Sequence, residues 1–408
     1  MSAKGPLAGL TVLDLTRVLA GPMSTMILAD LGARVIKVER PGKGDDTRQF
    51  GPPFVRDGDG NETSEAAYYM AANRNKESIT LDLSKSEGQT IARDLAIKAD
   101  FLFENFKAGD LAKYGLSYDD LKGANPGLIY CSITGFGHTG PYSSRGGYDS
   151  LVQAMSGLMS ITGLADDQPG GGPLRVGVPI SDMLTGMYGA IAALGALAHR
   201  KDTGEGQFID IALLDSAVAT LANQGMNYLA TGKAPGRIGN THPNIVPYQA
   251  FSTADGHIVV AVANDRQFER YAEILGEPAM ASDPRFLTNV ERVKNRDELI
   301  PHLSELMAAR TTAEWSADFE DGGVPCGPIN TLEDVFNDPQ ILAREMKVSL
   351  EHPLAGNVDL VGSPMKLSRT PVEYRHAPPL LGAHTDDVLR EIGRSVDDIA
   401  ALRKKGIV

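Results

Sequence analysis

The stretch "LTVLDLTRVLAGPMSTMILADLGARVIKVERP" (residues 10–41) decides the fold, because it contains a complete strand–helix–strand unit. Residues 10–16 are a short apolar run with β-branched side chains and predict a strand. Residues 23–33 have apolar side chains at helical spacing, and Pro22 suits the first helical turn. Residues 34–41 predict a second strand. Two strands joined by a helix indicate a parallel pair.

The same alternation continues downstream of this unit. Apolar runs at 78–83, 101–106 and 127–137 predict further strands, and 88–100 predicts a helix. Strands that alternate with helices indicate a mostly parallel sheet with helices on both faces. Ligands of such sheets bind beyond the carboxyl ends of the strands. We therefore predict an α/β fold whose ligand site lies at that edge of the sheet.

The pattern changes from about residue 230. Residues 248–262 predict a hairpin, and charged stretches with helical spacing follow between 266 and 320. Residues 323–329, "GVPCGPI", predict a rigid, turn-rich joint, and 378–393 predict a Gly/Pro-rich entry to a terminal helix. The chain therefore contains a second, smaller part of α+β character.

Length, charge and cysteine content limit the class of protein. A chain of 408 residues is too long for one ordinary core, which predicts two domains. The 39 basic and 52 acidic residues give a net charge of −13 without a basic block, which argues against nucleic acid as a partner. Cys131 and Cys326 cannot form a disulfide framework, and the first nine residues lack a signal-peptide pattern, so we expect a cytoplasmic protein. The longest apolar run, 183–198, is shorter than the roughly 20 residues of a membrane span, so we expect no membrane partner.

Several familiar site motifs find little support. "GFGHTG" (135–140) matches G-x-G-x-x-G, but Pro141 and a loop follow it instead of a helix, which argues against a nicotinamide site. The sequence contains no phosphate loop, no H-E-x-x-H and no G-x-S-x-G, and its eight histidines are scattered, so we expect no metal site. Cys326 is either a reactive thiol or, more simply, a small packing residue.

Several basic side chains lie at or near the ends of the predicted strands and in the loops that follow them. They are Arg40, Arg74, Lys76, Lys107 and Lys113. Taken singly, each fits a solvated surface charge. Taken together at one edge of a parallel sheet, they would form a site for phosphate groups.

Asp182 in "VGVPISDMLTG" (176–186) stands where a Gly/Pro-rich stretch gives way to a long apolar run. Asp is a preferred helix N-cap, and capping explains its position from local sequence. A carboxylate between apolar residues and a flexible loop near the ligand edge also suits a covalent nucleophile. Local reasoning leaves both readings open.

Ten segments in order resemble the family III CoA-transferases, the CaiB/BaiF family, which also contains α-methylacyl-CoA racemases. They are "LDLTRVLAGP", "GARVIKVERPGKGD", "NRNKESITLDL", "ENFKAGDLAKYGL", "ITGFGHTGPYSSRGGYD", "VGVPISDMLTG", "DTGEGQFIDIALLD", "DGHIVVAVANDRQF", "GVPCGPI" and "PPLLGAHTDDVL". The resemblance implies a large Rossmann-like domain formed by residues 1–225 and 331–408, and a small domain of residues 226–330. It also implies an intertwined homodimer.

The resemblance also implies the site residues. The family's catalytic aspartate falls on Asp182. The CoA-binding positions fall on Val18, Ala20, Arg40, Leu81, Asn105, Phe106, Lys107 and Lys113. Arginine and lysine suit the nucleotide phosphates, although some relatives have Arg where this chain has Lys113. CoA thioesters are expected as substrates, with no tightly bound cofactor and no metal.

One triplet separates the two activities of the family. Racemases carry His in a "G-H-D" triplet, whereas this chain has "GYD" with Tyr148. An unperturbed Tyr has a pKa near 10, against about 6.5 for His, and is a poor base at neutral pH. The racemase's acidic partner falls near Asp265. The resemblance therefore favours a transferase, with a racemase or epimerase as the alternative and a non-catalytic acyl-CoA-binding protein as the alternative of another class.

The expected reaction moves CoA from an acyl-CoA donor to a small carboxylic or dicarboxylic acid. It would proceed through an aspartyl anhydride and an aspartyl-CoA thioester on Asp182. Succinyl-CoA is the expected donor, while carnitine, formate or oxalate, and aromatic acids stay open as substrates. Tyr148, His242 and Tyr248 are the polar candidates for the substrate pocket.

Overall fold

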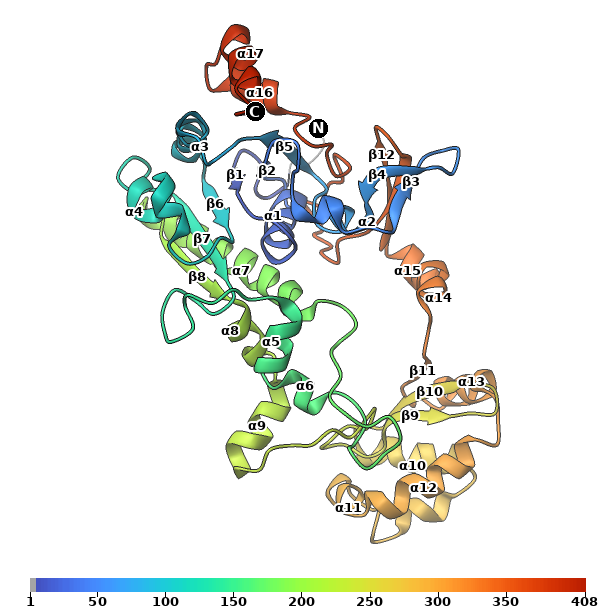
Figure 1. Ribbon diagram of the computed structural model, residues 1–408. Helices are drawn as coiled ribbons and strands as arrows, with labels where there is room; N and C mark the ends of the chain where they lie inside the picture. Colours follow the sequence, from blue (N-terminus) through green and yellow to red (C-terminus); the bar gives the residue numbers. More distant parts are fainter. Residues whose placement is uncertain (1–4) are drawn as a thin grey trace. The chain divides into compact units, whose positions relative to one another are not determined.

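The computed structural model describes residues 5–408, so part of the stretch on which the signal-peptide expectation rests lies outside the described residues. Its main feature is a six-stranded, fully parallel sheet in the order β5-β2-β1-β6-β7-β8 (Figure 1). The strands are β1 (Thr11–Asp14), β2 (Arg34–Glu39), β5 (Lys76–Thr80), β6 (Phe101–Glu104), β7 (Ile129–Thr134) and β8 (Phe208–Ala212). The α/β fold with a parallel sheet is thereby confirmed.

Helices cover both faces of this sheet because its strands are apolar on both sides. Val12 and Phe101 pack into one cluster, and their neighbours Leu13 and Leu102 pack into the other, as the period of two requires. The first cluster includes α1 (Ala20–Asp30) and α7 (Ile180–Thr203), and the second includes α3 (Ser86–Lys98), α16 (Thr385–Glu391) and α17 (Val396–Lys404).

Helices α1 and α7 approach each other closely through small residues. Ser24 Oγ of α1 donates to the carbonyl oxygen of Gly186 in α7 at 2.7 Å. A Cβ atom on Gly186 would lie 2.7 Å from the carbonyl oxygen of Ala20, and one on Gly189 would lie 2.6 Å from Ser24 Oγ. The order of these contacts means that α7 runs in the same direction as α1. The start of α7 therefore lies at the same edge of the sheet as the loop that precedes α1.

Gly186→Ala should destabilise the protein, because the added methyl group forces α7 away from α1. We expect the free energy of unfolding to fall by about 1 to 3 kcal/mol, the usual effect of overpacking. Urea unfolding measures it. Gly123→Ala is the matched control, because its Cβ would meet nothing within 4 Å. Equal stability of the two variants would contradict the close packing described here.

The chain divides into two compact units. Unit 1 contains the described residues up to 158, with 175–226 and 339–408, and includes the parallel sheet. Its last segment returns to the sheet edge, where His384 N donates to the carbonyl oxygen of Ser78 on β5 at 2.9 Å. Further elements of unit 1 are β3 (Phe54–Arg56), β4 (Glu62–Ala66), α2 (Ala67–Met70), α4 (Tyr118–Leu121), α5 (Asp149–Met155), α8 (Leu213–Ala219), α15 (Pro339–Ala343), β12 (Lys347–His352) and β13 (Gly356–Val361). Helix α14 (Leu332–Asn337) and all but the first residue of α6 (Leu158–Ile161) belong to unit 2, and α9 (Ala222–Thr231) spans the boundary between the two units in the sequence.

Unit 2, residues 159–174 and 227–338, is built on an antiparallel sheet in the order β11-β10-β9. Residues 323–329 are more than the joint that the sequence predicts, because β11 lies within them and pairs with β10. The pairing partner, not the local pattern, makes this segment a strand. The elements are β9 (Tyr248–Ser252), β10 (His257–Ala261), β11 (Cys326–Pro328), α10 (Asp265–Ile274), α11 (Asn289–Lys294), α12 (Arg296–Met307) and α13 (Thr312–Asp321).

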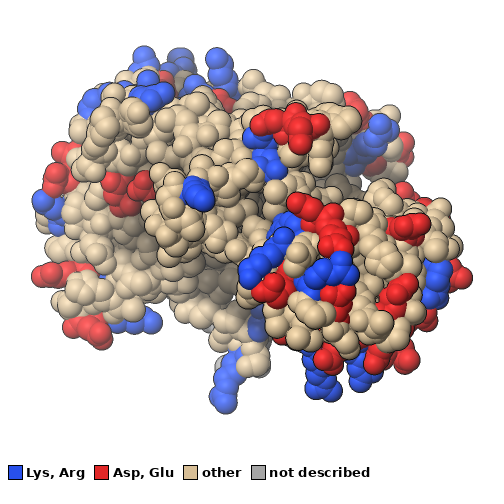
Figure 2. All heavy atoms as spheres, turned by 90° about the horizontal axis from the view of Figure 1, so that it is seen from below, with Lys and Arg blue, Asp and Glu red and all other residues tan. Residues whose placement is uncertain are grey.

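Charged side chains of both signs are mixed on one face of the molecule. On the face shown in Figure 2, the basic and acidic side chains of residues 5–408 lie among each other, with uncharged surface between them, and no broad basic patch is visible. Helix α7 is the one helix of the described chain that is long and apolar enough to cross a membrane, by length and composition alone. It packs on α1 and contributes Ala190 and Ala193 to the core of unit 1.

Candidate active site

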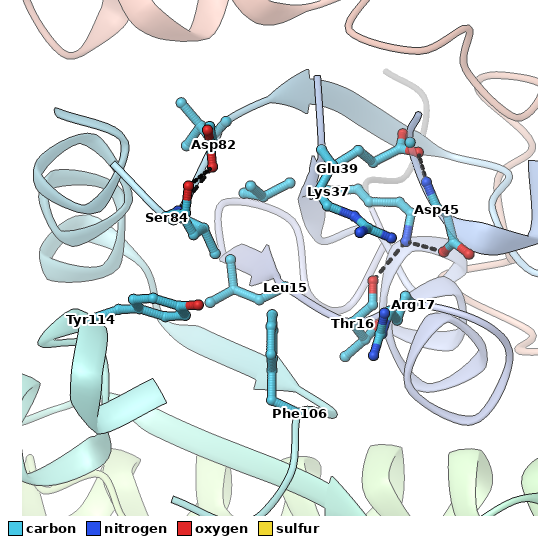
Figure 3. Close-up of a pocket in the computed structure, with 15 residues that line it drawn as sticks. Leu15, Thr16, Arg17, Lys37, Glu39, Asp45, Asp82, Ser84, Phe106 and Tyr114 are labelled. Atoms are coloured by element: carbon cyan, nitrogen blue, oxygen red, sulfur yellow. Dashed lines mark hydrogen bonds and ion pairs between the residues drawn. The ribbon is translucent and has the colours of Figure 1, made fainter. Parts of the chain in front are cut away.

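A pocket of about 250 Å³ lies at the carboxyl edge of the parallel sheet in unit 1 (Figure 3). The loops after β1, β2, β5 and β6 meet there, as expected for an α/β fold. Three of the expected CoA-binding residues, Arg40, Leu81 and Phe106, line it. The other lining residues are Leu15, Thr16, Arg17, Lys37, Val38, Glu39, Gly44, Asp45, Asp82, Leu83, Ser84 and Tyr114. The pocket thus combines apolar and aromatic surface with polar groups.

Two fully buried ion pairs lie in unit 1, and one of them, Lys37 with Asp45, lines this pocket. Lys37 Nζ lies 2.9 Å from the Asp45 carboxylate and donates to the carbonyl oxygen of Thr16 at 2.8 Å (Figure 3). Lys76 Nζ lies 3.1 Å from the Asp14 carboxylate. Burial opposes the charge of Lys37, but the neighbouring carboxylates, Asp45 first, outweigh it and raise the pKa of Lys37. Lys37 and Lys76 stay charged although they are buried, because each lies beside an oppositely charged carboxylate.

The loop between β1 and α1 is held in a strained conformation. Val18 has φ of +70°, a region that β-branched residues almost never adopt. Asp45 Oδ1 accepts from Val18 N at 3.1 Å, and the Asn105 side chain bonds both the amide and the carbonyl of Arg17, at 2.9 and 2.6 Å. Strain of this kind costs on the order of 1–3 kcal/mol and persists only where surrounding contacts impose it. Two expected CoA-binding residues lie here: Val18 in the loop and the buried Ala20 as the first residue of α1.

Asp182 lies in the first turn of α7, at the third helical position. The interpretation of Asp182 as the N-cap is wrong: the N-cap is Pro179, which makes no side-chain cap bond. Because α7 packs parallel to α1, this first turn lies toward the same edge of the sheet as the pocket. The positive end of the α7 dipole favours an ionised carboxylate there.

The surroundings of Asp182 make it an unusually basic carboxylate. Burial, with an additional contribution from the Asp149 carboxylate, raises the pKa of Asp182 to about 7. The causes of this shift include neither a cation nor a hydrogen-bond donor among residues 5–408. The Tyr68 phenol is close enough for Asp182 and Asp149, after burial, to raise its pKa. A carboxylate that ionises near neutral pH and is not tied to a cation suits nucleophilic attack.

If ionised Asp182 reacts, the rate of CoA transfer should rise with pH through about 7. The ionised fraction at pH 6 is about one tenth of that at pH 8, so we expect a rate about tenfold lower at pH 6. Initial rates at saturating substrates from pH 5 to 9 measure it. A rate independent of pH between 6 and 8 would contradict the prediction.

The same pKa affects stability. In the unfolded chain an Asp titrates near 3.9, whereas Asp182 in the folded protein titrates at about 7. The folded state therefore binds the extra proton, and stability is lost as pH rises through this window. Asp182→Asn has no carboxylate to ionise and therefore does not lose this stability. The difference in Tm between the variant and the wild type, variant minus wild type, should be larger at pH 8 than at pH 5. Thermal unfolding at both pH values checks the sign, and a constant difference would contradict it.

The remaining expected CoA contacts are spread around the pocket. Asn105 is half-buried and holds the Arg17 backbone, while Lys107 and Lys113 are exposed and do not line the pocket. Lys113 Nζ lies 3.5 Å from the Asp110 carboxylate. The proposed phosphate site loses two members, because Arg74 is buried against Asp30 and Lys76 against Asp14. Their carboxylate partners explain why these charged side chains lie inside.

The candidate substrate residues have different surroundings. Tyr148 is 75% exposed at the start of α5. In unit 2, the rings of His242 and Tyr248 stack with centroids 5.1 Å apart. Asp265 lies near the position of the racemase's acidic catalytic residue. It accepts a hydrogen bond from Asn289 N and forms an ion pair with the buried Arg292 at 2.8 Å. This pairing gives Asp265 a structural role.

Sequence reasoning missed several residues of the site. Arg17, Ser84 and Tyr114 line the pocket, and Tyr68 and Asp149 share the electrostatic environment of Asp182. Arg17 and Ser84 directly follow predicted strands, which is a usable signal, whereas Tyr68 has none. Over residues 5–408, no group of three or more His, Cys, Asp or Glu side chains is arranged to hold a metal ion.

Comparisons with known proteins identify the family of the chain. The family model for CoA-transferase family III matches residues 7–385. A succinate–glutarate CoA-transferase of Agrobacterium fabrum (strain C58 / ATCC 33970) is 49% identical over 389 residues, covering 95% of this chain and 96% of that protein. A succinyl-CoA:glutarate CoA-transferase of Homo sapiens is 45% identical over 404 residues, covering 99% of this chain and 90% of that protein.

Solved structures give the same result. A crystal structure of a CaiB/BaiF family protein from Brucella suis has a TM-score of 0.83 and 47% sequence identity, and covers 95% of this chain and 100% of that chain. A hypothetical protein from Mycobacterium tuberculosis has a TM-score of 0.83 and 31% identity, with 95% and 100% coverage. These matches confirm the resemblance inferred from the sequence. The chain belongs to CoA-transferase family III.

Proposed function

We propose that this enzyme transfers CoA from succinyl-CoA to a small dicarboxylic acid, with glutarate as the first candidate acceptor. The observation that carries the proposal is the Asp182 carboxylate, which ionises near neutral pH at the edge where the pocket opens. The names of the relatives from Agrobacterium fabrum and Homo sapiens support the donor and the acceptor. Succinyl-CoA:mesaconate CoA-transferase of Haloarcula hispanica, 40% identical, supports the donor with a different acceptor.

Asp182 acts as the covalent carrier in this mechanism. Its carboxylate attacks the thioester carbonyl of succinyl-CoA and displaces CoA thiolate, which leaves a mixed anhydride of Asp182 and succinate. The thiolate attacks the aspartyl carbonyl, releases succinate and forms an aspartyl-CoA thioester. The acceptor carboxylate then displaces the thiolate and forms a second anhydride. Attack of the thiolate on the acceptor carbonyl yields the new CoA thioester and restores Asp182.

The binding residues have separate tasks in this scheme. Arg40 and the exposed Lys107 and Lys113 bind the phosphate groups of CoA as cations. Leu81 and Phe106 contact apolar or aromatic parts of the substrate. The strained backbone around Val18, with Ala20 and Asn105 beside it, approaches the thioester arm. CoA thioesters are substrates in this scheme, and it includes no tightly bound cofactor.

A donor–acceptor panel tests the proposal. Succinyl-CoA is supplied with glutarate, mesaconate, oxalate or carnitine, and each CoA product is separated by chromatography. We expect transfer to dicarboxylates, with glutarate foremost. Deuterium exchange at the α-carbon of a 2-methylacyl-CoA without transfer would instead support a racemase. Acyl-CoA binding without either reaction would support a non-catalytic protein.

We further propose a homodimer. Large apolar side chains on the neighbouring helices α5, α7 and α8 of unit 1 are exposed, and a second copy of the chain would cover them. These side chains are Leu151, Met155, Met187, Tyr188, Ile191 and Val218. Light scattering coupled to size-exclusion chromatography should give twice the mass of one chain for wild type. A monomeric mass for wild type at micromolar concentration would contradict the proposal.

The remaining assignments rest on the same family membership. We propose the large domain of residues 1–225 and 331–408, the small domain of 226–330, and a cytoplasmic location without a membrane or nucleic-acid partner. Tyr148, His242 and Tyr248 stay predicted substrate-pocket residues. The net charge of −13 supports the exclusion of nucleic acid.

A further inference from the structure

Helix α7 begins without a cap of its own, and another helix supplies the missing acceptor. The N-cap Pro179 makes no side-chain cap bond. Asp149, the first residue of α5, instead accepts from Ser181 N through Oδ1 at 2.9 Å. Ser181 directly precedes Asp182. A first-turn amide of a helix needs such an acceptor, and here it comes from 32 residues away in the sequence.

A second side chain of α5 extends this contact. Gln153 Nε2 donates to the other Asp149 oxygen at 2.7 Å, and Gln153 Oε1 accepts from Val176 N at 2.9 Å. Asp149 is 9% exposed and Gln153 is fully buried. The pair therefore holds residues 176–181 at both ends. Between these ends Gly177 and Val178 are exposed, so the segment has little packing of its own.

We propose that Asp149 and Gln153 form a clamp that positions the Asp182 carboxylate for attack on the acyl-CoA thioester, which makes both of them positioning residues. The inference rests on the proposed role of Asp182 as nucleophile. Reacting atoms must be held within about 0.5 Å of the productive geometry, and a displacement of 1 Å costs about 100-fold in rate. A loop tethered at one end only does not give this precision.

The clamp also places a negative charge, the Asp149 carboxylate, near Asp182. Asp149 brings a second carboxylate toward Asp182 from α5, and the titratable group that faces both from α2 is the Tyr68 phenol. Asp45 acts on the same phenol from the loop after β2. No cation contributes to the shift of Asp182 among the described residues. The residue that fixes the position of the nucleophile therefore also disfavours its ionisation and increases its basicity.

Three variants separate position from charge. Asp149→Asn keeps an oxygen acceptor for Ser181 N and removes the charge, together with the acceptor for Gln153 Nε2. Gln153→Ala removes the Val176 tether and keeps the charge. Asp149→Ala removes the charge and the acceptors for Ser181 N and Gln153 Nε2. Asp202→Asn, at the exposed far end of α7, is the matched control. For each, kcat and the KM for succinyl-CoA are measured from pH 5 to 9.

We expect Asp149→Ala to lower kcat by about 10- to 100-fold with KM for succinyl-CoA within about twofold, because the pocket is not part of the clamp. Asp149→Asn should move the acid limb of the pH profile to lower pH by about one unit. Gln153→Ala should lower kcat without moving the limb. If the contact of Asp149 were merely structural, Asp149→Asn would leave the limb in place.

Wild-type kcat and an unmoved limb in both Asp149 variants would overturn the clamp. If Asp149→Ala unfolds, the limb of the folded Asp149→Asn variant decides alone. Failure of the proposed function gives a different result: Asp182→Ala would then retain transfer, and hydroxylamine would form no hydroxamate on Asp182 in the wild type. An inactive Asp182→Ala with normal Asp149 variants overturns the clamp only.

Discussion

Asp182→Ala is expected to lower the rate of CoA transfer by roughly a thousandfold or more, because the variant cannot form either covalent intermediate. Acyl-CoA binding should change little, since the pocket is lined by residues of the loops after β1, β2, β5 and β6. Initial rates with succinyl-CoA and glutarate measure the first effect, and isothermal titration with CoA measures the second.

Two comparisons make this result specific to the carboxylate. Asp202→Asn changes an exposed carboxylate at the other end of the same helix and should keep wild-type rates. Hydroxylamine treatment of the wild type in the presence of succinyl-CoA should convert Asp182 to a hydroxamate, which mass spectrometry detects. Substantial turnover by Asp182→Ala would show that the transfer is direct.

Asp45→Ala is expected to cause the largest loss of stability, about 3 to 5 kcal/mol, because it leaves the fully buried Lys37 without its partner. It also removes the acceptor for Val18 N, so the loop can relax from its positive φ. We therefore expect the KM for succinyl-CoA to rise about tenfold or more. Urea unfolding and steady-state kinetics measure the two effects.

The double variant Lys37→Met/Asp45→Asn is the control for unpaired charge. It removes both charges and keeps an oxygen for Val18 N, so it should lose clearly less stability than Asp45→Ala. If both variants lose the same free energy of unfolding, the effect of Asp45→Ala comes from lost hydrogen bonds. A loss below about 1 kcal/mol in Asp45→Ala would contradict the importance of the buried pair.

The fold was predictable where its signal is local. The strand–helix–strand unit of residues 10–41 appears as β1, α1 and β2. It was predictable because the pattern of apolar residues that indicates a strand or a helix involves only residues close together in the sequence. Strand β11 was not predictable, since "CGP" has no alternation and becomes a strand only by pairing with Val260 and its neighbours. The return of the last residues to β5 likewise depends on contacts across the whole chain.

The site was predictable in its position but less so in its details. The carboxyl edge of the sheet, and Arg40, Leu81 and Phe106 at the pocket, followed from topology and resemblance. Arg74 and Lys76 were expected at the surface, but Asp30 and Asp14 compensate their burial. No local sequence pattern predicts that a buried carboxylate will lie beside such a basic side chain. The same holds for Asp149, whose bond to Ser181 N joins two helices that the sequence shows only as separate segments.

The return of the chain end to β5 has a consequence for synthesis on the ribosome. Ser78 and its partner His384 are 306 residues apart, so this edge of the sheet stays unpaired until that many further residues have been translated. At about 5–20 residues per second, this takes roughly 15 to 60 s. An unpaired parallel-sheet edge is a template for association with other nascent chains. We therefore expect a chaperone to have a long opportunity to bind this edge strand during synthesis.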